Sequence, residues 1–114
     1  MDLDFSPEEL AFRDEVRVFL RDKLPASVRD GARACPTVFV EPDVGQAWNA
    51  VLNEQGWLGY QWPSEVGGTG WTPTQHYIWE QETARATLPW DMPFGVGMVA
   101  PIIMGYGSKE QQER

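Results

Sequence analysis

The chain has 114 residues and a formal net charge of −8 at pH 7, with 9 Lys and Arg against 17 Asp and Glu. This length suits one domain with its own hydrophobic core, so we treat residues 1–114 as a single domain. The acidic balance argues against nucleic acid as a partner, because Lys and Arg side chains neutralise a phosphate backbone.

The cysteine and histidine content excludes two further kinds of site. Cys35 has no second cysteine to pair with, and His76 is the one histidine, so neither a disulfide nor a zinc-type metal site is expected. The uncharged stretch 92–108 contains prolines and glycines, and it is shorter than the roughly 20 apolar residues of a membrane-spanning helix. The residues Met1–Asp4 are acidic where a targeting peptide is basic. We expect a cytoplasmic domain with no membrane partner.

Caps and periodicity predict the first three helices. The first begins at Ser6-Pro7-Glu8-Glu9, a capping box with proline at the first helical position, and it ends before Pro25. Its apolar residues at helical spacing are Phe12, Val16, Phe19 and Leu20. The second begins near Pro42, ends at Gly56 and has one apolar face of Val44, Ala47, Trp48, Val51 and Leu52. The third begins with the capping box Thr72-Pro73-Thr74-Gln75 and ends before Pro89.

A fourth helix is predicted from Phe94 to Tyr106. It is apolar all round, which is typical of a helix buried on every side, and Pro101 should kink or divide it. Ser108-Lys109-Glu110-Gln111 is a third capping box, which opens a further helix. Val38-Phe39-Val40 is too short to anchor a sheet, and the stretch from Ala26 to Glu41 is predicted to be a loop or irregular connection. The predicted fold is all-α: a compact bundle of about four to six helices with a long irregular connection after the first helix.

The glycine loop Gly67-Gly68-Thr69-Gly70 has two interpretations. Glycines let backbone N–H groups approach an anion, and a helix N-terminus follows, so the loop could cradle a phosphate. The spacing matches neither the Walker lysine loop nor the dinucleotide-binding motif, and no strand precedes it. A tight structural turn is the favoured interpretation, because glycine is the usual residue where φ must be positive.

The charged residues offer no catalytic set. Arg13, Arg17 and Arg21 share a face of the first helix, and Glu9, Asp14 and Asp22 beside them predict a solvated, charge-paired face rather than an anion site. Glu80 and Glu82 are two residues apart on a helix, so they point to different faces and form no dyad. His76 lies one turn before Glu80, which predicts a surface pairing.

The central motif resembles the acyl-CoA dehydrogenase family. Gly56-Trp57-Leu58-Gly59 is followed by Trp62-Pro63-Ser64-Glu65-Val66-Gly67-Gly68-Thr69-Gly70, similar to the family's Gly-Trp pair, Trp-Pro, acidic residue and Gly-Gly-x-Gly turn. Phe5 to Arg13 resembles the family's first helix, and Glu80 to Ala86 its Glu-x-Glu-x-Ala-Arg-Ala helix. Phe94 to Pro101 and Gly107 to Arg114 resemble the pocket helix and the Gly-Ser-x-Glu-Gln element. The Trp-Pro-x-Glu and Gly-Trp-Thr-Pro motifs are most similar to those of the large-subunit, pimeloyl-CoA dehydrogenase-like type.

This resemblance implies the amino-terminal helical domain of an FAD-dependent oxidoreductase that dehydrogenates an acyl-CoA thioester between its α and β carbons. In such enzymes the catalytic glutamate and most flavin contacts lie in later domains. No residue of this chain therefore inherits a catalytic role, and we expect no FAD on this chain alone and no activity from it. Acyl-CoA and electron-transfer flavoprotein are the partners implied for the complete enzyme.

The same resemblance assigns this domain part of the acyl-pocket wall, which falls by position on Phe94, Gly95, Met98 and Val99. These residues could equally be core, and the glycines leave space where a ligand would pass. Because the apolar helix needs cover on every side, we also expect the isolated chain to expose an apolar patch and to self-associate. The alternative is a stand-alone helical interaction module without enzymatic activity. Neither the identity of the acyl-CoA nor the oligomeric state follows from these residues.

Overall fold

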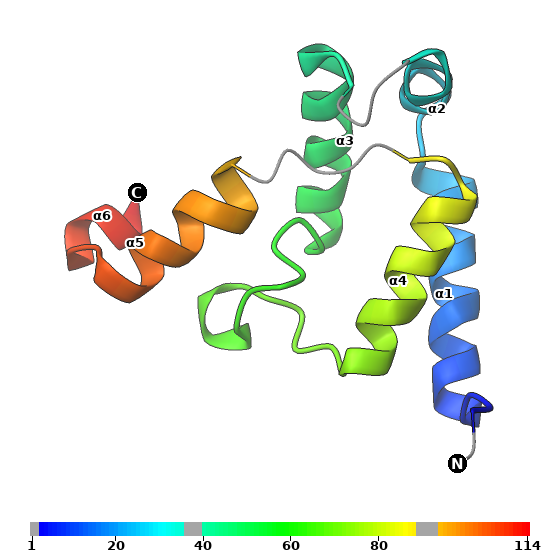
Figure 1. Cartoon of the computed structure of the whole chain (residues 1–114), viewed down its shortest axis with the longest axis horizontal. Helices are drawn as coiled ribbons and strands as arrows, with labels where there is room; N and C mark the ends of the chain where they lie inside the picture. Colours follow the sequence, from blue (N-terminus) through cyan, green and yellow to red (C-terminus); the bar gives the residue numbers. More distant parts are fainter. Residues whose placement is uncertain (1–2, 36–39, 89–93) are drawn as a thin grey trace.

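The computed structural model of the chain describes residues 3–35, 40–88 and 94–114, and every regular element within those ranges is helical. The all-α fold class is therefore confirmed (Figure 1). The elements in chain order are α1 (Pro7–Lys23), α2 (Ala26–Ala34), α3 (Pro42–Gln55), the 3-10 turn η1 (Ser64–Val66), α4 (Pro73–Arg85), the π-helical segment η2 (Phe94–Val99), α5 (Ala100–Tyr106) and α6 (Lys109–Glu113).

Helices α1 and α4 lie side by side and pack on each other (Figure 1). Each begins with its predicted capping box. In α4, the Thr72 N–H donates to Gln75 Oε1 at 2.8 Å, and the Gln75 N–H donates to Thr72 Oγ1 at 3.2 Å. These bonds satisfy two backbone donors that have no partner inside the helix. All the predicted apolar positions of α1 are buried: Phe12, Val16, Phe19 and Leu20.

Helix α3 follows its prediction at both ends. It begins at Pro42, and Gly56 ends it with φ at +83°, a left-handed conformation that glycine adopts without steric cost. Its apolar face is narrower than predicted, since Trp48 and Leu52 are buried, Val44 and Val51 are partly buried, and Ala47 is exposed.

The connection predicted over Ala26–Glu41 is shorter than expected, because α2 occupies its first part. Val28 is fully buried and α2 packs on α3, where a Cβ on Gly31 would approach Val44 Cγ2 to 2.8 Å. This helix has no side-chain cap and contains an internal glycine, so no capping motif signals it. Residues 36–39, including most of the short Val38–Val40 run, lie outside the described part of the chain.

An aromatic cluster forms the core where α1, α4 and the segment after α3 meet. The Trp57 ring contacts those of Phe19, Trp71 and Trp79 at centroid distances of 4.6, 5.3 and 5.3 Å, each edge-on. Such edge-to-face contacts are the preferred geometry of aromatic pairs. Trp48, Trp57 and Trp79 are buried, so the tryptophan-rich middle of the sequence is the densely packed part of the bundle.

The segments η2, α5 and α6, which we call the C-terminal arm, lie to one side of helices α1 to α4, which we call the bundle (Figure 1). The predicted single helix over 94–106 is divided at Ala100, next to Pro101, into a π-helical and an α-helical part. The bundle does not surround this apolar helix, which agrees with the expectation that the isolated chain exposes an apolar patch. Its exposed side chains are Met98 (52%), Val99 (51%), Ile102 (60%) and Tyr106 (90%).

The dimensions of the molecule reflect the projecting arm. The radius of gyration is 15.3 Å, whereas a compact domain of this length has about 13 Å. The accessible surface is 7994 Å², against roughly 6,300 Å² for a folded monomer of this mass. The excess is apolar in part, so the exposed patch predicted from the sequence is present.

Candidate functional site

The predicted pocket-wall residues all lie on η2, the first segment of the arm. Gly95, Met98 and Val99 are exposed there, and a Cβ placed on Gly95 would meet no atom within 4 Å. The backbone of Phe94 opens η2, while its side chain lies outside the described structure. π-Helical turns are rare, and they are frequently found at functional sites.

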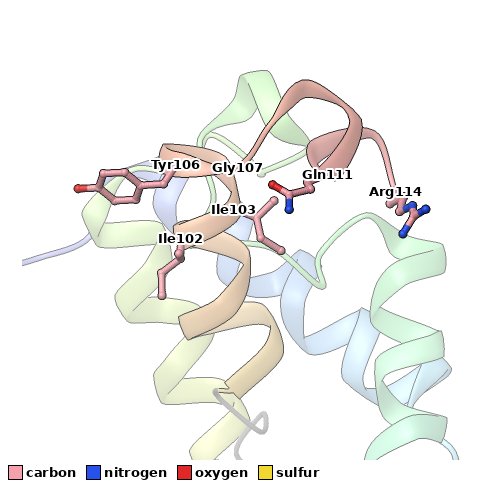
Figure 2. A pocket seen from close by; sticks show the side chains of 6 residues that line it. All are labelled: Ile102, Ile103, Tyr106, Gly107, Gln111 and Arg114. Carbon is pink, nitrogen blue, oxygen red and sulfur yellow. The ribbon is translucent and has the colours of Figure 1, made fainter.

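A hollow lies on the next turns of the arm, between α5 and α6. Figure 2 shows its wall, which is apolar on α5 and polar on α6, and its volume is about 460 Å³. Its lining residues are Ile102, Ile103, Tyr106, Gly107, Gln111 and Arg114. None of the predicted pocket-wall residues lines this hollow, so the wall assigned to η2 remains a prediction.

The corner between α5 and α6 is closed by side-chain hydrogen bonds. The third predicted capping box is present, with Ser108 N–H donating to Gln111 Oε1 at 2.8 Å. Gln112 Nε2 lies 3.2, 3.1 and 3.3 Å from the carbonyl oxygens of Ile103, Met104 and Gly107. The Ile103 carbonyl also accepts from the Gly107 N–H at 2.8 Å, so Gln112 adds a side-chain cap to the end of α5, where carbonyls have few backbone partners. Sequence reasoning did not identify this role of Gln112, because its acceptors are backbone atoms that no motif reveals.

Trp62 connects the bundle to the arm. Its indole Nε1–H donates to the carbonyl oxygen of Val96, 34 residues later, at 2.8 Å. Val96 lies inside η2, between the predicted wall residues Gly95 and Met98. The bond joins the tryptophan of the Trp-Pro motif to the segment that the sequence associated with the acyl pocket.

The glycine loop forms a structural turn, and the phosphate interpretation loses two of its backbone donors. The Gly67 N–H donates to the Ser64 carbonyl at 3.3 Å, and the Gly68 N–H donates to the Pro63 carbonyl at 3.0 Å. Gly67 has φ at +95° and Gly70 at +67°, values that favour glycine. Because these two N–H groups are used inside the turn, they are not available to bind a phosphate.

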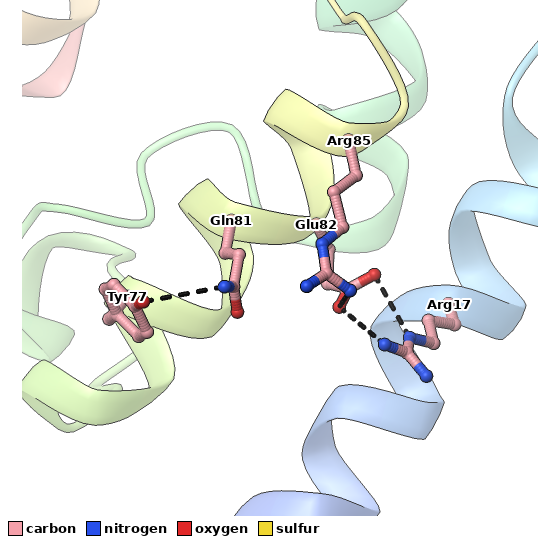
Figure 3. A network of polar contacts seen from close by, with 5 residues as sticks. All are labelled: Arg17, Tyr77, Gln81, Glu82 and Arg85. Atoms are coloured by element: carbon pink, nitrogen blue, oxygen red, sulfur yellow. Dashed lines mark hydrogen bonds and ion pairs between the residues drawn. The ribbon is translucent and has the colours of Figure 1, made fainter. Parts of the chain in front are cut away.

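An ion pair between α1 and α4 replaces one of the local pairings predicted for the arginine face. Figure 3 shows Arg17 facing Glu82, with Nε and Nη2 each donating to one carboxylate oxygen at 3.1 Å. The side chain of Glu82 is 7% exposed, and Arg85 Nη1 lies 3.9 Å from its Oε1. The hydrogen bonds to Glu82 raise the pKa of Arg17 above its ordinary value. Arg21 does pair locally with Asp22, at 2.9 Å.

The acidic residues of α4 do not assemble into an acid–base pair. Glu80 is exposed whereas Glu82 is buried, so they lie on different faces as predicted. The ring of His76 contacts those of Tyr60 and Trp71 at 5.5 and 5.8 Å. The surface pairing predicted between His76 and Glu80 is absent from the hydrogen bonds and ion pairs found in the described ranges. No three His, Cys, Asp or Glu residues of those ranges gather as metal ligands.

Comparison with known proteins decides the family. Residues 6–114 match the family "Acyl-CoA dehydrogenase, N-terminal domain". The chain belongs to the acyl-CoA dehydrogenase family, as its N-terminal domain. It is therefore a member of an oxidoreductase family, and the stand-alone interaction module is not favoured.

Relatives of this acyl-CoA dehydrogenase domain come from mycobacteria. Acyl-CoA dehydrogenase FadE26 of Mycobacterium tuberculosis is 32% identical over 116 residues, which cover 98% of this chain and 28% of the relative. Acyl-CoA dehydrogenase IpdE1 of Mycolicibacterium smegmatis is 32% identical over 106 residues, which cover 90% of this chain and 27% of the relative. The chain thus spans little more than a quarter of the length of these relatives.

A solved structure has the same fold. The crystal structure of the ChsE4-ChsE5 complex from Mycobacterium tuberculosis contains a chain that is 28% identical, with a TM-score of 0.74. The match covers 99% of this chain and 27% of that one. In the described ranges of this acyl-CoA dehydrogenase domain, no helix combines the length and apolar character needed to cross a membrane.

Proposed function

We propose that this chain acts as the N-terminal helical domain of an FAD-dependent acyl-CoA dehydrogenase that introduces a double bond between the α and β carbons of an acyl-CoA thioester. The observation that carries the proposal is the family match over residues 6–114, which corresponds to little more than a quarter of the relatives' length. The domain contributes part of the acyl-pocket wall and contacts to the other domains, whereas the catalytic base and most flavin contacts belong to later domains of the enzyme. By itself the chain is inactive.

The test combines two samples. The purified chain should show neither the visible absorption band of bound flavin nor acyl-CoA-dependent reduction of an artificial electron acceptor. A polypeptide in which the domain is followed by the rest of a dehydrogenase should show both. A flavin band or turnover from the chain alone would contradict the assignment of these functions to other domains, and an inactive, flavin-free complete polypeptide would contradict the proposed activity.

Within the complete enzyme, η2 forms part of the acyl-pocket wall through Phe94, Gly95, Met98 and Val99. Support comes from the exposed apolar side chains of Met98 and Val99 and from the open space beside Gly95. A wall residue should act through the length of the acyl chain, because added volume blocks long chains before short ones.

We expect Gly95→Leu in the complete enzyme to lower kcat/KM for long acyl-CoA substrates about tenfold or more, the effect of about 1.4 kcal/mol, and to affect short ones little. Gly105→Leu is the matched control, since a Cβ on Gly105 in α5 also meets open space. A uniform loss with all chain lengths, or an equal chain-length effect of Gly105→Leu, would contradict a pocket wall at η2.

Partners of the complete enzyme are acyl-CoA as substrate and electron-transfer flavoprotein as electron acceptor. The fold similarity to a chain in the ChsE4-ChsE5 complex supports an enzyme that assembles with further subunits. The proposed setting is the cytoplasm, which the lone Cys35 supports, since small secreted domains commonly rely on disulfides.

A further inference from the structure

Two glycines of the same motif, Gly59 and Gly68, leave the space that Trp62 occupies. The Trp62 N–H donates to the Gly59 carbonyl at 2.9 Å, and a Cβ on Gly59 would approach ring atoms Cδ2 and Cε3 to 2.5 Å. On the other side, a Cβ on Gly68 would overlap the Trp62 carbonyl group. Both glycines therefore leave room for this tryptophan, and the ring has a defined position in the bundle.

The Val96 carbonyl, which accepts from the Trp62 indole, lacks the N–H donor that a π-helix would supply. A π-helix pairs the carbonyl of residue i with the N–H of residue i+5. For Val96 in η2 that residue is Pro101, which has no N–H. Trp62 Nε1 lies 2.8 Å from the Val96 oxygen and supplies the missing donor. Trp62 therefore donates the hydrogen bond that Pro101 cannot donate, although the two residues are far apart in sequence.

This bond acts at the place where the arm departs from the bundle. The arm segments contact chiefly one another, with α5 against η2 and α5 against α6. Gly95 and Met98 lie within one turn of Val96, so any shift of the Val96 carbonyl moves them as well.

We propose that Trp62 is a positioning residue: its indole N–H binds the Val96 carbonyl that Pro101 leaves without a helical donor, and this bond sets where η2 lies relative to the bundle. The consequence for the acyl pocket rests on the proposed function, whereas the position of the arm does not. Trp62 thereby sets the place of the wall in the complete enzyme without touching the reacting atoms.

The first experiment measures the arm directly in the chain. Spin labels replace the exposed Glu15 on α1 and Glu110 on α6 in a Cys35→Ser background, and pulsed dipolar spectroscopy gives their distance distribution. An excess of unlabelled chain keeps the measured distances intramolecular. Trp62→Phe retains an aromatic ring and removes the donor, and we expect the distribution to broaden while the thermal unfolding midpoint of the bundle changes little.

Trp71→Phe is the matched control, because Trp71 lies in the aromatic cluster and contacts Phe12 and Trp57. It should lower the unfolding midpoint and leave the distribution narrow. The proposal is overturned if Trp62→Phe leaves the distribution unchanged, if Trp71→Phe broadens it equally, or if the unsubstituted chain is already broad.

A second measurement tests the part played by Pro101. Pro101→Ala restores an N–H that competes for the Val96 carbonyl, so the indole hydrogen of Trp62 should exchange with solvent faster, as followed by NMR. An unchanged exchange rate would remove Pro101 from the proposal. These results concern the arm alone, whereas a failed chain-length test on Gly95→Leu would remove the pocket wall and leave the role of Trp62 standing.

Discussion

Glu82 is the residue whose environment differs most from its sequence context. It lies in a charged stretch of α4, yet its side chain is 7% exposed and receives both hydrogen bonds from Arg17 on α1. A buried carboxylate needs such a partner because desolvation disfavours its charge. The ion pair therefore joins α1 to α4 and favours one relative position of the two helices.

We expect Glu82→Gln to lower the thermal unfolding midpoint by several degrees, measured by circular dichroism, because the bidentate contact with Arg17 is lost. Asp22→Asn is the control, since Asp22 pairs with its exposed neighbour Arg21. That pair lowers the pKa of Asp22, so its small contribution is present above about pH 4 and fades as the pH falls through the lowered value. Equal effects of both substitutions at pH 7 would contradict a special role of Glu82.

Gly67 and Gly68 are adjacent but should respond differently to alanine. A Cβ on Gly67 meets no atom within 4 Å, and the cost there is the positive φ, roughly 1–2 kcal/mol. A Cβ on Gly68 would overlap the Trp62 carbonyl, so the backbone must move, and we expect a loss of about 3 kcal/mol. Chemical denaturation of both variants measures the difference. A larger loss for Gly67→Ala would show that conformation, not space, decides this turn.

At the scale of elements, three helices begin with a capping box but differ in what they pack against. Ser6, Thr72 and Ser108 each complete a capping box. Helices α1 and α4 pack on each other, whereas α6 contacts α5 at the end of the arm. The same local stabilisation therefore supports the cooperative core in two cases and a peripheral helix in the third.

We expect Thr72→Ala to lower the free energy of unfolding by about 1 kcal/mol, the usual value of a lost N-cap. Ser108→Ala should leave global unfolding nearly unchanged and speed amide exchange in α6 and at the end of α5, because that corner can open on its own. Denaturation monitored together with hydrogen exchange makes the comparison. A loss from Ser108→Ala as large as that from Thr72→Ala would mean that the arm and the bundle unfold as one unit.

At the scale of the whole molecule, the arm gives the chain a surface larger than its mass requires. The accessible surface of 7994 Å² exceeds the expectation for a compact monomer by roughly 1,700 Å², which is more than the roughly 800 Å² that each partner buries in a standard interface. Exposed apolar residues of the arm contribute to it, among them Ile102 and Tyr106. Such a patch is typical of surfaces that meet another protein.

We therefore expect the isolated chain to self-associate at concentrations on the order of tens of micromolar, measured by light scattering in physiological salt, which screens the net charge of −8. Ile102→Glu should return it to the monomer. Val18→Glu is the control, since Val18 is also exposed but lies on α1 in the bundle. A monomeric parent chain, or equal dissociation by both substitutions, would contradict association through the arm.

The sequence by itself determined whatever depends on neighbours within a few residues. The capping boxes, the buried face of α1, the glycine end of α3 and the division beside Pro101 are local, and they appeared where predicted. The family motif belongs to the same group, because its residues are contiguous. Helix α2 was not predicted because it is short and has no capping motif, and its contact with α3 supplies stability that the local sequence does not show.

Only the tertiary structure decided the contacts between distant segments. Arg17 and Glu82 are 65 residues apart, and Trp62 and Val96 are 34 apart, so no periodicity links them. The apolar helix shows the same limit: its hydrophobicity indicates that its surface needs cover, but the arrangement of helices decides which of its side chains this chain covers. In this domain α1 and α4 pack on each other within the bundle, whereas apolar side chains of the arm stay exposed.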